Sequence, residues 1–169
     1  MPLHVALFLL FGIGAIATAI GTVTRRNPVA AAVNLIAHFF MLAGLYLTLQ
    51  AQFLAVLQIL VYAGAIMVLV VFVIMLLNLG NEEALREQFT LRKVLGVVLA
   101  AIFLLQIGVL VNARPTGALY QSPQAAALGT AESIGRALFT QYLFPFEAIS
   151  LLLLAALVGA IILAKRKVE

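Results

Sequence analysis

The sequence predicts an all-α integral membrane protein that forms a single transmembrane domain over residues 1–169. Hydrophobic residues make up 65% of the chain and charged residues only 9%, whereas about a quarter of the residues in an average soluble domain are charged. The mean hydropathy is +1.20. A small soluble protein could not bury this much apolar surface, so lipid must be the solvent for most of the chain.

Five apolar stretches approach the roughly 20 residues that a helix needs to cross a bilayer. We expect transmembrane helices at residues 3–23, 29–49, 53–77, 94–111 and 144–164. The second helix has a recognisable start, because Asn27 is a favourable N-cap residue and Pro28 suits the first helical position. The connection at residues 50–52 is short, so the second and third helices should form an antiparallel hairpin.

The basic residues predict the orientation, because cytoplasmic loops of membrane proteins are enriched in Lys and Arg. Eight of the 10 Lys and Arg residues fall in the first loop, the third loop or the C-terminal tail, and two fall in the loop at 112–143. The N-terminus is therefore predicted outside, the 112–143 loop in the periplasm and the C-terminus in the cytoplasm. Within that loop, Thr130 is expected to cap a short interfacial helix that contacts a partner.

The polar residues leave little room for catalysis by this chain. It has no Cys, two His and six acidic residues, all of them Glu. Thiolate nucleophiles, disulfides and cysteine-bound iron–sulfur clusters are excluded, and the remaining residues are too few for a hydrolytic triad or a metal site. We expect no catalytic, cofactor-binding or metal-binding residue here. The pI near 9.9 is attributed to basic loops of a membrane protein and not to nucleic-acid binding.

Three polar side chains in the predicted helices have two interpretations each. Asn34 and His38 lie four residues apart, and therefore on one face of the second helix. They could serve a proton or water path, although the residues alone favour hydrogen bonds between helices. Glu147 is expected in the first turn of the last helix, where the helix dipole and headgroup water favour an anion. The alternative is a titrating group at the mouth of a proton path.

The middle of the third helix holds a further polar pair beside a glycine. Gln58 and Tyr62 are again four residues apart, and Gly64 follows within an otherwise apolar run. Ala63, Gly64 and Ala65 would permit close packing against another helix, and the residues alone favour that role. The alternative is a change of winding at Gly64, since a wide turn there would free carbonyls and re-aim Tyr62, as π-bulges do at functional sites.

These motifs resemble those of one protein family. The matching segments are LQILVYAGAIMVL at 57–69, Arg-Asn-Pro at 26–28, GTAESIGRALFT at 129–140 and YLFPFE at 142–147. They resemble subunit J of the bacterial proton-pumping NADH:quinone oxidoreductase, respiratory complex I, whose mitochondrial counterpart is NADH dehydrogenase subunit six. The resemblance covers essentially the whole chain.

The resemblance implies a membrane-arm subunit of an enzyme complex with no redox centre of its own. NADH, FMN, iron–sulfur clusters and quinone would bind to other subunits. The implied partners are the quinone-site subunit, subunit K, the antiporter-like subunits and the lipid of the bacterial cytoplasmic (inner) membrane.

The resemblance also implies a mechanism, in which the third helix switches between α and π winding near Tyr62 and Gly64. The switch would gate a water path that couples quinone reduction to proton translocation. Some members of the family carry Glu at the position of Gln58. Because Gln58 can organise water but cannot take up a proton, this departure favours a gate over a direct proton relay.

A second class of function stays open at this point. Multi-subunit cation/proton antiporters and membrane-bound hydrogenases share ancestry with this membrane module, so the motifs also fit a subunit of such a complex. The identity of the partner subunits distinguishes the two, since flavin and iron–sulfur subunits indicate complex I.

Overall fold

The computed structural model describes residues 3–77, 91–113 and 127–165, which form helices joined by turns. The helices are α1 (Leu3–Thr24), α2 (Pro28–Thr48), α3 (Gln52–Leu57), η1 (Gln58–Ile66), α4 (Met67–Leu76), α5 (Leu91–Ala113), α7 (Ala131–Thr140) and α8 (Leu143–Ala164). The segments α3, η1 and α4 follow one another without a break and form one rod, which is called helix three below. These ranges contain no strand, in agreement with the all-α prediction.

Four of the five predicted spans are long and apolar enough to cross a membrane: α1, α2, helix three and α8. The fourth predicted span, 94–111, lies within α5, whose apolar part Val94–Leu110 is shorter. That α5 crosses the bilayer therefore stays a prediction.

The start of α2 follows from two residues that were predicted to begin it. The Asn27 side chain accepts hydrogen bonds from the backbone N–H groups of Val29 at 2.9 Å and Ala30 at 3.1 Å. These groups have no acceptor within the helix, because the first turn lacks a preceding one. Pro28 occupies the first helical position, where its missing N–H costs nothing.

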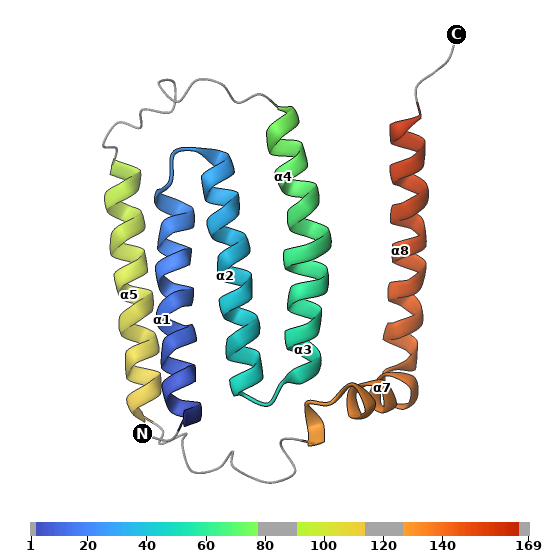
Figure 1. Ribbon diagram of the computed structural model, residues 1–169, viewed down its shortest axis with the longest axis horizontal. Coiled ribbons are helices and arrows are strands. Elements are labelled where there is room, and N and C mark those ends of the chain that lie inside the picture. Colours follow the sequence, from blue (N-terminus) through green and yellow to red (C-terminus); the bar gives the residue numbers. More distant parts are fainter. Residues whose placement is uncertain (1–2, 78–90, 114–126, 166–169) are drawn as a thin grey trace.

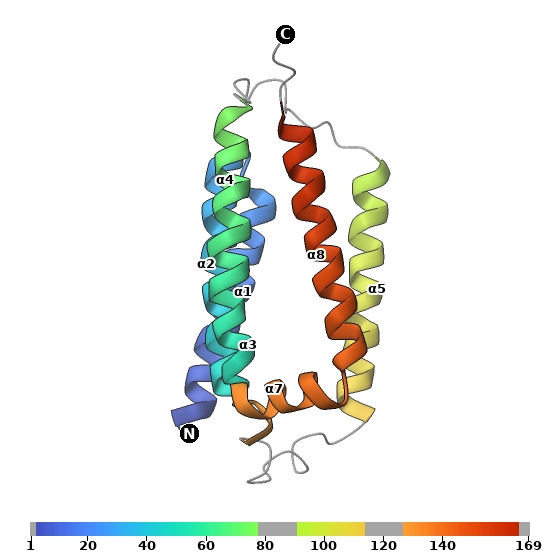
Figure 2. The ribbon, with the colours of Figure 1, turned by 90° about the vertical axis from the view of Figure 1, so that its right-hand side faces the viewer.

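The described helices fall into a central layer and two outlying helices. In Figures 1 and 2, α1, α2 and helix three stand side by side, with α2 in the middle, and α2 contacts both of its neighbours. Figure 2 shows α5 and α8 displaced from this layer. Among the described residues, α8 packs only against α7, and α5 packs against no other helix. The short helix α7 lies across the end of the bundle, between the start of helix three and the start of α8.

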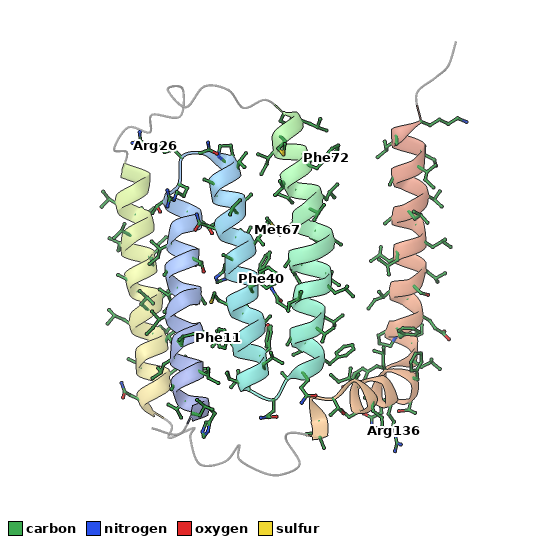
Figure 3. The ribbon with its side chains drawn as sticks, in the orientation of Figure 1. Phe11, Arg26, Phe40, Met67, Phe72 and Arg136 are labelled. Atoms are coloured by element: carbon green, nitrogen blue, oxygen red, sulfur yellow. The ribbon has the colours of Figure 1, made fainter. Side chains whose placement is uncertain are left out.

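Small residues allow the helices of the central layer to approach closely. Ala15 of α1 and Ala32, Ala43 and Gly44 of α2 are buried. The ring of Phe11 lies so close to Gly44 that a side chain there would collide with it (Figure 3). Since lipid is as apolar as these residues, such helix contacts depend on close packing more than on the hydrophobic effect.

The start of α1 and the end of α8 lie at opposite ends of the bundle, and α7 lies at the end where α1 starts (Figure 1). This arrangement fits the predicted placement of the N-terminus and the 112–143 loop on one side. Which end faces the cytoplasm stays a prediction. Residues 78–90, 114–126 and 166–169 contain Arg86, Arg114, Arg166 and Lys167, which entered that prediction, and they lie outside the described residues.

Candidate functional site

Helix three changes its winding at mid-length. Its first and last parts are α-helical, but the nine residues Gln58–Ile66 form a π-helix. At the end of this segment the N–H of Met67 donates to the carbonyl of Tyr62, five residues earlier. Such i→i+5 bonds widen the helix. They are rare in proteins and occur frequently at functional sites. The π winding that the family resemblance implied near Tyr62 and Gly64 is therefore present, although the residues alone favoured a packing role.

Gly64 and Ala63 have different roles in this segment. A Cβ added to Gly64 would lie 3.2 Å from the carbonyl oxygen of Ile59, five residues earlier in the same helix, and within 4 Å of no other described atom. The constraint on Gly64 therefore comes from the wide winding itself. Ala63 is the buried small residue. The packing role that the sequence assigned to all three small residues thus falls on Ala63.

Gln58 and Tyr62 lie in different surroundings, although they are four residues apart. The side chain of Gln58 is only 7% exposed, whereas Tyr62 is 47% exposed. The Tyr62 ring meets the ring of Phe39 in α2 edge to face, with centroids 5.7 Å apart. No hydrogen bond of the Tyr62 hydroxyl or the Gln58 amide is found within the described ranges.

Met67 secures the junction between η1 and α4. Its side chain is 2% exposed, the largest fully buried side chain in the described part of the chain. It lies between helix three and α2 (Figure 3), which contact each other here. The sequence offered no signal for Met67 or Phe39, because an apolar residue in an apolar helix does not reveal which neighbour it faces.

His38 joins α2 to α1. Its Nδ1 lies 2.9 Å from the backbone carbonyl of Ala15, and since a carbonyl can only accept, Nδ1 carries the hydrogen and donates it. The hydroxyl of Thr18 lies 3.5 Å from the same nitrogen. The predicted hydrogen bond between helices is therefore confirmed for His38. The next residue, Phe39, contacts Tyr62. Two adjacent residues of α2 therefore contact α1 on one side and the π-helical segment on the other.

Asn34 was also predicted to form a hydrogen bond between helices, but its hydrogen bond lies within its own helix. Its Nδ2 donates to the carbonyl of Ala30 in its own helix at 3.0 Å. Its Oδ1 lies 3.0 Å from where a Cβ of Gly21 would be. Asn34 therefore packs over a glycine of α1 and bonds to the backbone of α2.

Glu147 lies apart from the other candidates. Helix α8 begins at Leu143, and its first turn contains no acidic residue, so the expected first-turn position of Glu147 is wrong. Because the dipole effect fades beyond the first turn, it supports this carboxylate less than expected. Glu147 is exposed, and α8 contacts neither helix three nor α2 in the described structure. This chain therefore does not bring Glu147 to the π-helical segment.

Within the described ranges, no three His, Cys, Asp or Glu side chains come close enough to hold a metal ion. The distinctive feature is a wide, glycine-containing turn at the centre of a rod that is long and apolar enough to cross a membrane. Fold and site together define a multi-pass membrane protein with a π-wound segment in its third helix.

Comparison with known proteins gives the family. Residues 18–163 match the family of NADH-ubiquinone/plastoquinone oxidoreductase chain 6, and the chain belongs to this family. It is 35% identical to NADH-quinone oxidoreductase subunit J of Rhodobacter capsulatus, over 98% of this chain and 84% of the relative. It is 37% identical to subunit J of Escherichia coli (strain K12), over 90% of this chain and 82% of the relative.

A chloroplast protein is similar as well. NAD(P)H-quinone oxidoreductase subunit 6 of Physcomitrium patens is 35% identical, over 98% of this chain and 86% of the relative. These three relatives are subunits of quinone oxidoreductases, which are enzyme complexes. Their names favour the complex I interpretation over an antiporter or hydrogenase subunit.

Proposed function

We propose that this chain is a membrane-arm subunit of a proton-pumping NADH:quinone oxidoreductase in the bacterial cytoplasmic membrane. It carries no redox centre and couples quinone reduction to proton translocation through a change of winding in helix three. Electrons pass through FMN and iron–sulfur clusters in partner subunits. The chain's neighbours are the quinone-site subunit, subunit K and the antiporter-like subunits. The observation that supports this proposal most is the π-helical segment Gln58–Ile66 at the centre of a membrane-spanning helix of this family.

A change of winding is an effective way to move side chains inside a membrane. An α-helix turns about 100° per residue, so gaining or losing one residue from the winding rotates everything beyond it by about 100°. Both windings keep most backbone groups hydrogen-bonded within the helix, which the bilayer interior requires, and the few carbonyls freed at the wide turn can bind water. Returning Gln58–Ile66 to α winding would therefore turn Met67–Leu76 without breaking helix three.

Tyr62 and Gln58 are the polar groups that such a rotation re-aims. In the π-wound state Tyr62 is half exposed and Gln58 is buried. A mid-membrane phenol needs a partner or water, so changing its direction makes or breaks a path for water. Gln58 orders water without titrating, which suits a gate. Protons would then cross on water and on ionisable groups of neighbouring subunits.

Two measurements test this proposal at separate levels. Purification of the chain in mild detergent, followed by mass spectrometry, should return flavin-binding and iron–sulfur subunits together with the antiporter-like subunits. Recovery with antiporter or hydrogenase subunits alone would refute membership in this enzyme. Structures of the resting and the turning-over complex should then differ in the winding of residues 58–66. Identical winding in both states would refute the gating role and leave the chain with a purely structural role in the complex.

A further inference from the structure

The segment before α7 is joined directly to the turn between α2 and α3. The N–H of Phe53 donates to the carbonyl of Gly129 at 3.1 Å. A Cβ at Gly129 would collide with the backbone carbonyl of Gln50 and lie 3.2 Å from Cα of Ala51. The two backbones are thus in direct contact, which only glycine allows. Figures 1 and 2 show α7 starting at the base of α3.

The turn that receives Gly129 is itself firmly held. Gln50 adopts a left-handed conformation with φ of 61°, and the N–H of Ala51 donates to the carbonyl of Tyr46 at 2.9 Å. Phe53 lies in the first turn of α3, where N–H groups have no acceptor within the helix. Gly129 supplies one of these acceptors from a distant part of the sequence. We call the contact of Gly129 with Gln50, Ala51 and Phe53 the latch.

The helix that follows the latch is well anchored at both ends. Thr130 is the predicted N-cap of α7, and its hydroxyl accepts from the N–H of Ser133 at 3.3 Å. The Ser133 hydroxyl donates to the carbonyl of Leu128 at 2.7 Å. At the other end, the rings of Phe139 in α7 and Phe146 in α8 meet edge to face, 5.0 Å apart. Helix α7 therefore connects the base of helix three to α8.

The latch lies at the start of α3, and Phe53 is five residues before the π-helical segment begins at Gln58. A change of winding rotates the two ends of helix three relative to each other. If one end is held in place, the other end makes most of the rotation. The α3 end is held by backbone hydrogen bonds of fixed geometry. The α4 end meets α2 through Met67, and methionine is flexible enough to repack.

We propose that Gly129 is a positioning residue for the winding gate. Through the latch it holds Gln52–Leu57 fixed, so that a change of winding in Gln58–Ile66 turns Met67–Leu76. This inference depends on the proposed gating function. It assigns the rotation to the half of helix three that follows Tyr62 and gives α7 the role of a strap that resists rotation at the base.

Spin labels on introduced cysteines can test this in the assembled complex. The chain has no cysteine of its own, and signals from labelled cysteines of partner subunits are subtracted with a complex that carries the unmodified chain. Val56 in α3 and Leu69 in α4 are exposed labelling positions, and Val33 in α2 provides a common reference. Pulsed electron paramagnetic resonance on two doubly labelled variants would measure the Val33–Val56 and Val33–Leu69 distances, in resting enzyme and during NADH oxidation. A side chain at about 5 Å from the helix axis moves roughly 8 Å in a 100° rotation. The Leu69 distance should change by several ångströms and the Val56 distance should not.

The variant Gly129→Ala should break the latch and free α3 to rotate, because the added Cβ would collide with the backbone of Gln50. The Val56 distance should now change during turnover, and the ratio of protons pumped to NADH oxidised should fall. Gly135→Ala in α7 is the matched control, since a Cβ there has no atom within 4 Å in the described structure. It should leave both distances and the ratio unchanged.

The possible outcomes separate the latch from the gate. If Val56 moves as far as Leu69 in the unmodified chain, or if Gly129→Ala behaves like Gly135→Ala, the latch is wrong while the winding gate stands. If neither label moves in the unmodified chain, the winding gate fails and the latch fails with it. Should Gly129→Ala not assemble, the comparison of the two labels in the unmodified chain decides the question.

Discussion

Replacement of Gly64 is the most direct test of the π-helical segment. In Gly64→Ala the new Cβ lies 3.2 Å from the Ile59 carbonyl oxygen, closer than ordinary van der Waals contact. The backbone must give by a few tenths of an ångström, and bond-angle distortions of this kind cost about 1 kcal/mol. That oxygen constrains the π winding, because it belongs to the residue five positions earlier. Gly64→Ala should therefore raise the ratio of the α-wound to the π-wound form of this segment by about fivefold.

Valine extends the same test. Its branched side chain is stiff and adds two methyl groups at the crowded position, so we expect a cost of about 2 kcal/mol and a shift of roughly thirtyfold. If both windings are needed in each cycle, NADH:quinone turnover and proton pumping should fall in the order Gly, Ala, Val. The assay is turnover together with pumping by the assembled complex in proteoliposomes, with assembly checked by subunit content.

The control is Gly12→Ala in α1, where an added Cβ has no described atom within 4 Å. It should behave like the unmodified enzyme. Normal turnover and pumping in an assembled Gly64→Val complex would refute the winding switch. Equal losses in Gly64→Ala and Gly12→Ala would show that the effect does not depend on the Ile59 contact.

Three further substitutions examine the surroundings of the segment. Met67→Ala removes the buried side chain between α4 and α2, which in protein cores costs about 2 kcal/mol or more. The complex should lose thermal stability, whereas Met75→Ala, at an exposed position of α4, should not. His38→Leu removes the bond to Ala15, and such bonds between membrane helices average about 0.6 kcal/mol. A small loss of stability with full pumping is expected, and loss of pumping in an assembled complex would instead indicate a proton path. Glu147→Gln should pump normally, because Glu147 is exposed and distant from helix three; a reduced proton yield at normal turnover would assign it a titrating role.

Features determined by neighbouring residues could be predicted from the sequence. Asn27 and Thr130 act as N-caps as expected, because a cap needs only its own side chain and the next turn of backbone. Helix positions agree with the apolar stretches to within a few residues, and Glu147 was misplaced because α8 starts at Leu143 and places it beyond the first turn. The tyrosine and glycine in an apolar run left both packing and a change of winding open, and the residues alone favoured packing. Only the structure showed that π winding spans Gln58–Ile66.

The sequence by itself predicted apolar helices, and the described parts of the chain are helical, with four helices long and apolar enough to cross a membrane. Only the tertiary structure decided that Ala63 and Met67 are buried in helix three, that His38 bonds to Ala15 and that Gly129 meets the turn before α3. The physical reason is that hydropathy and capping depend on local sequence. Contacts between apolar helices are non-directional, so their partners emerge only when distant segments are placed side by side.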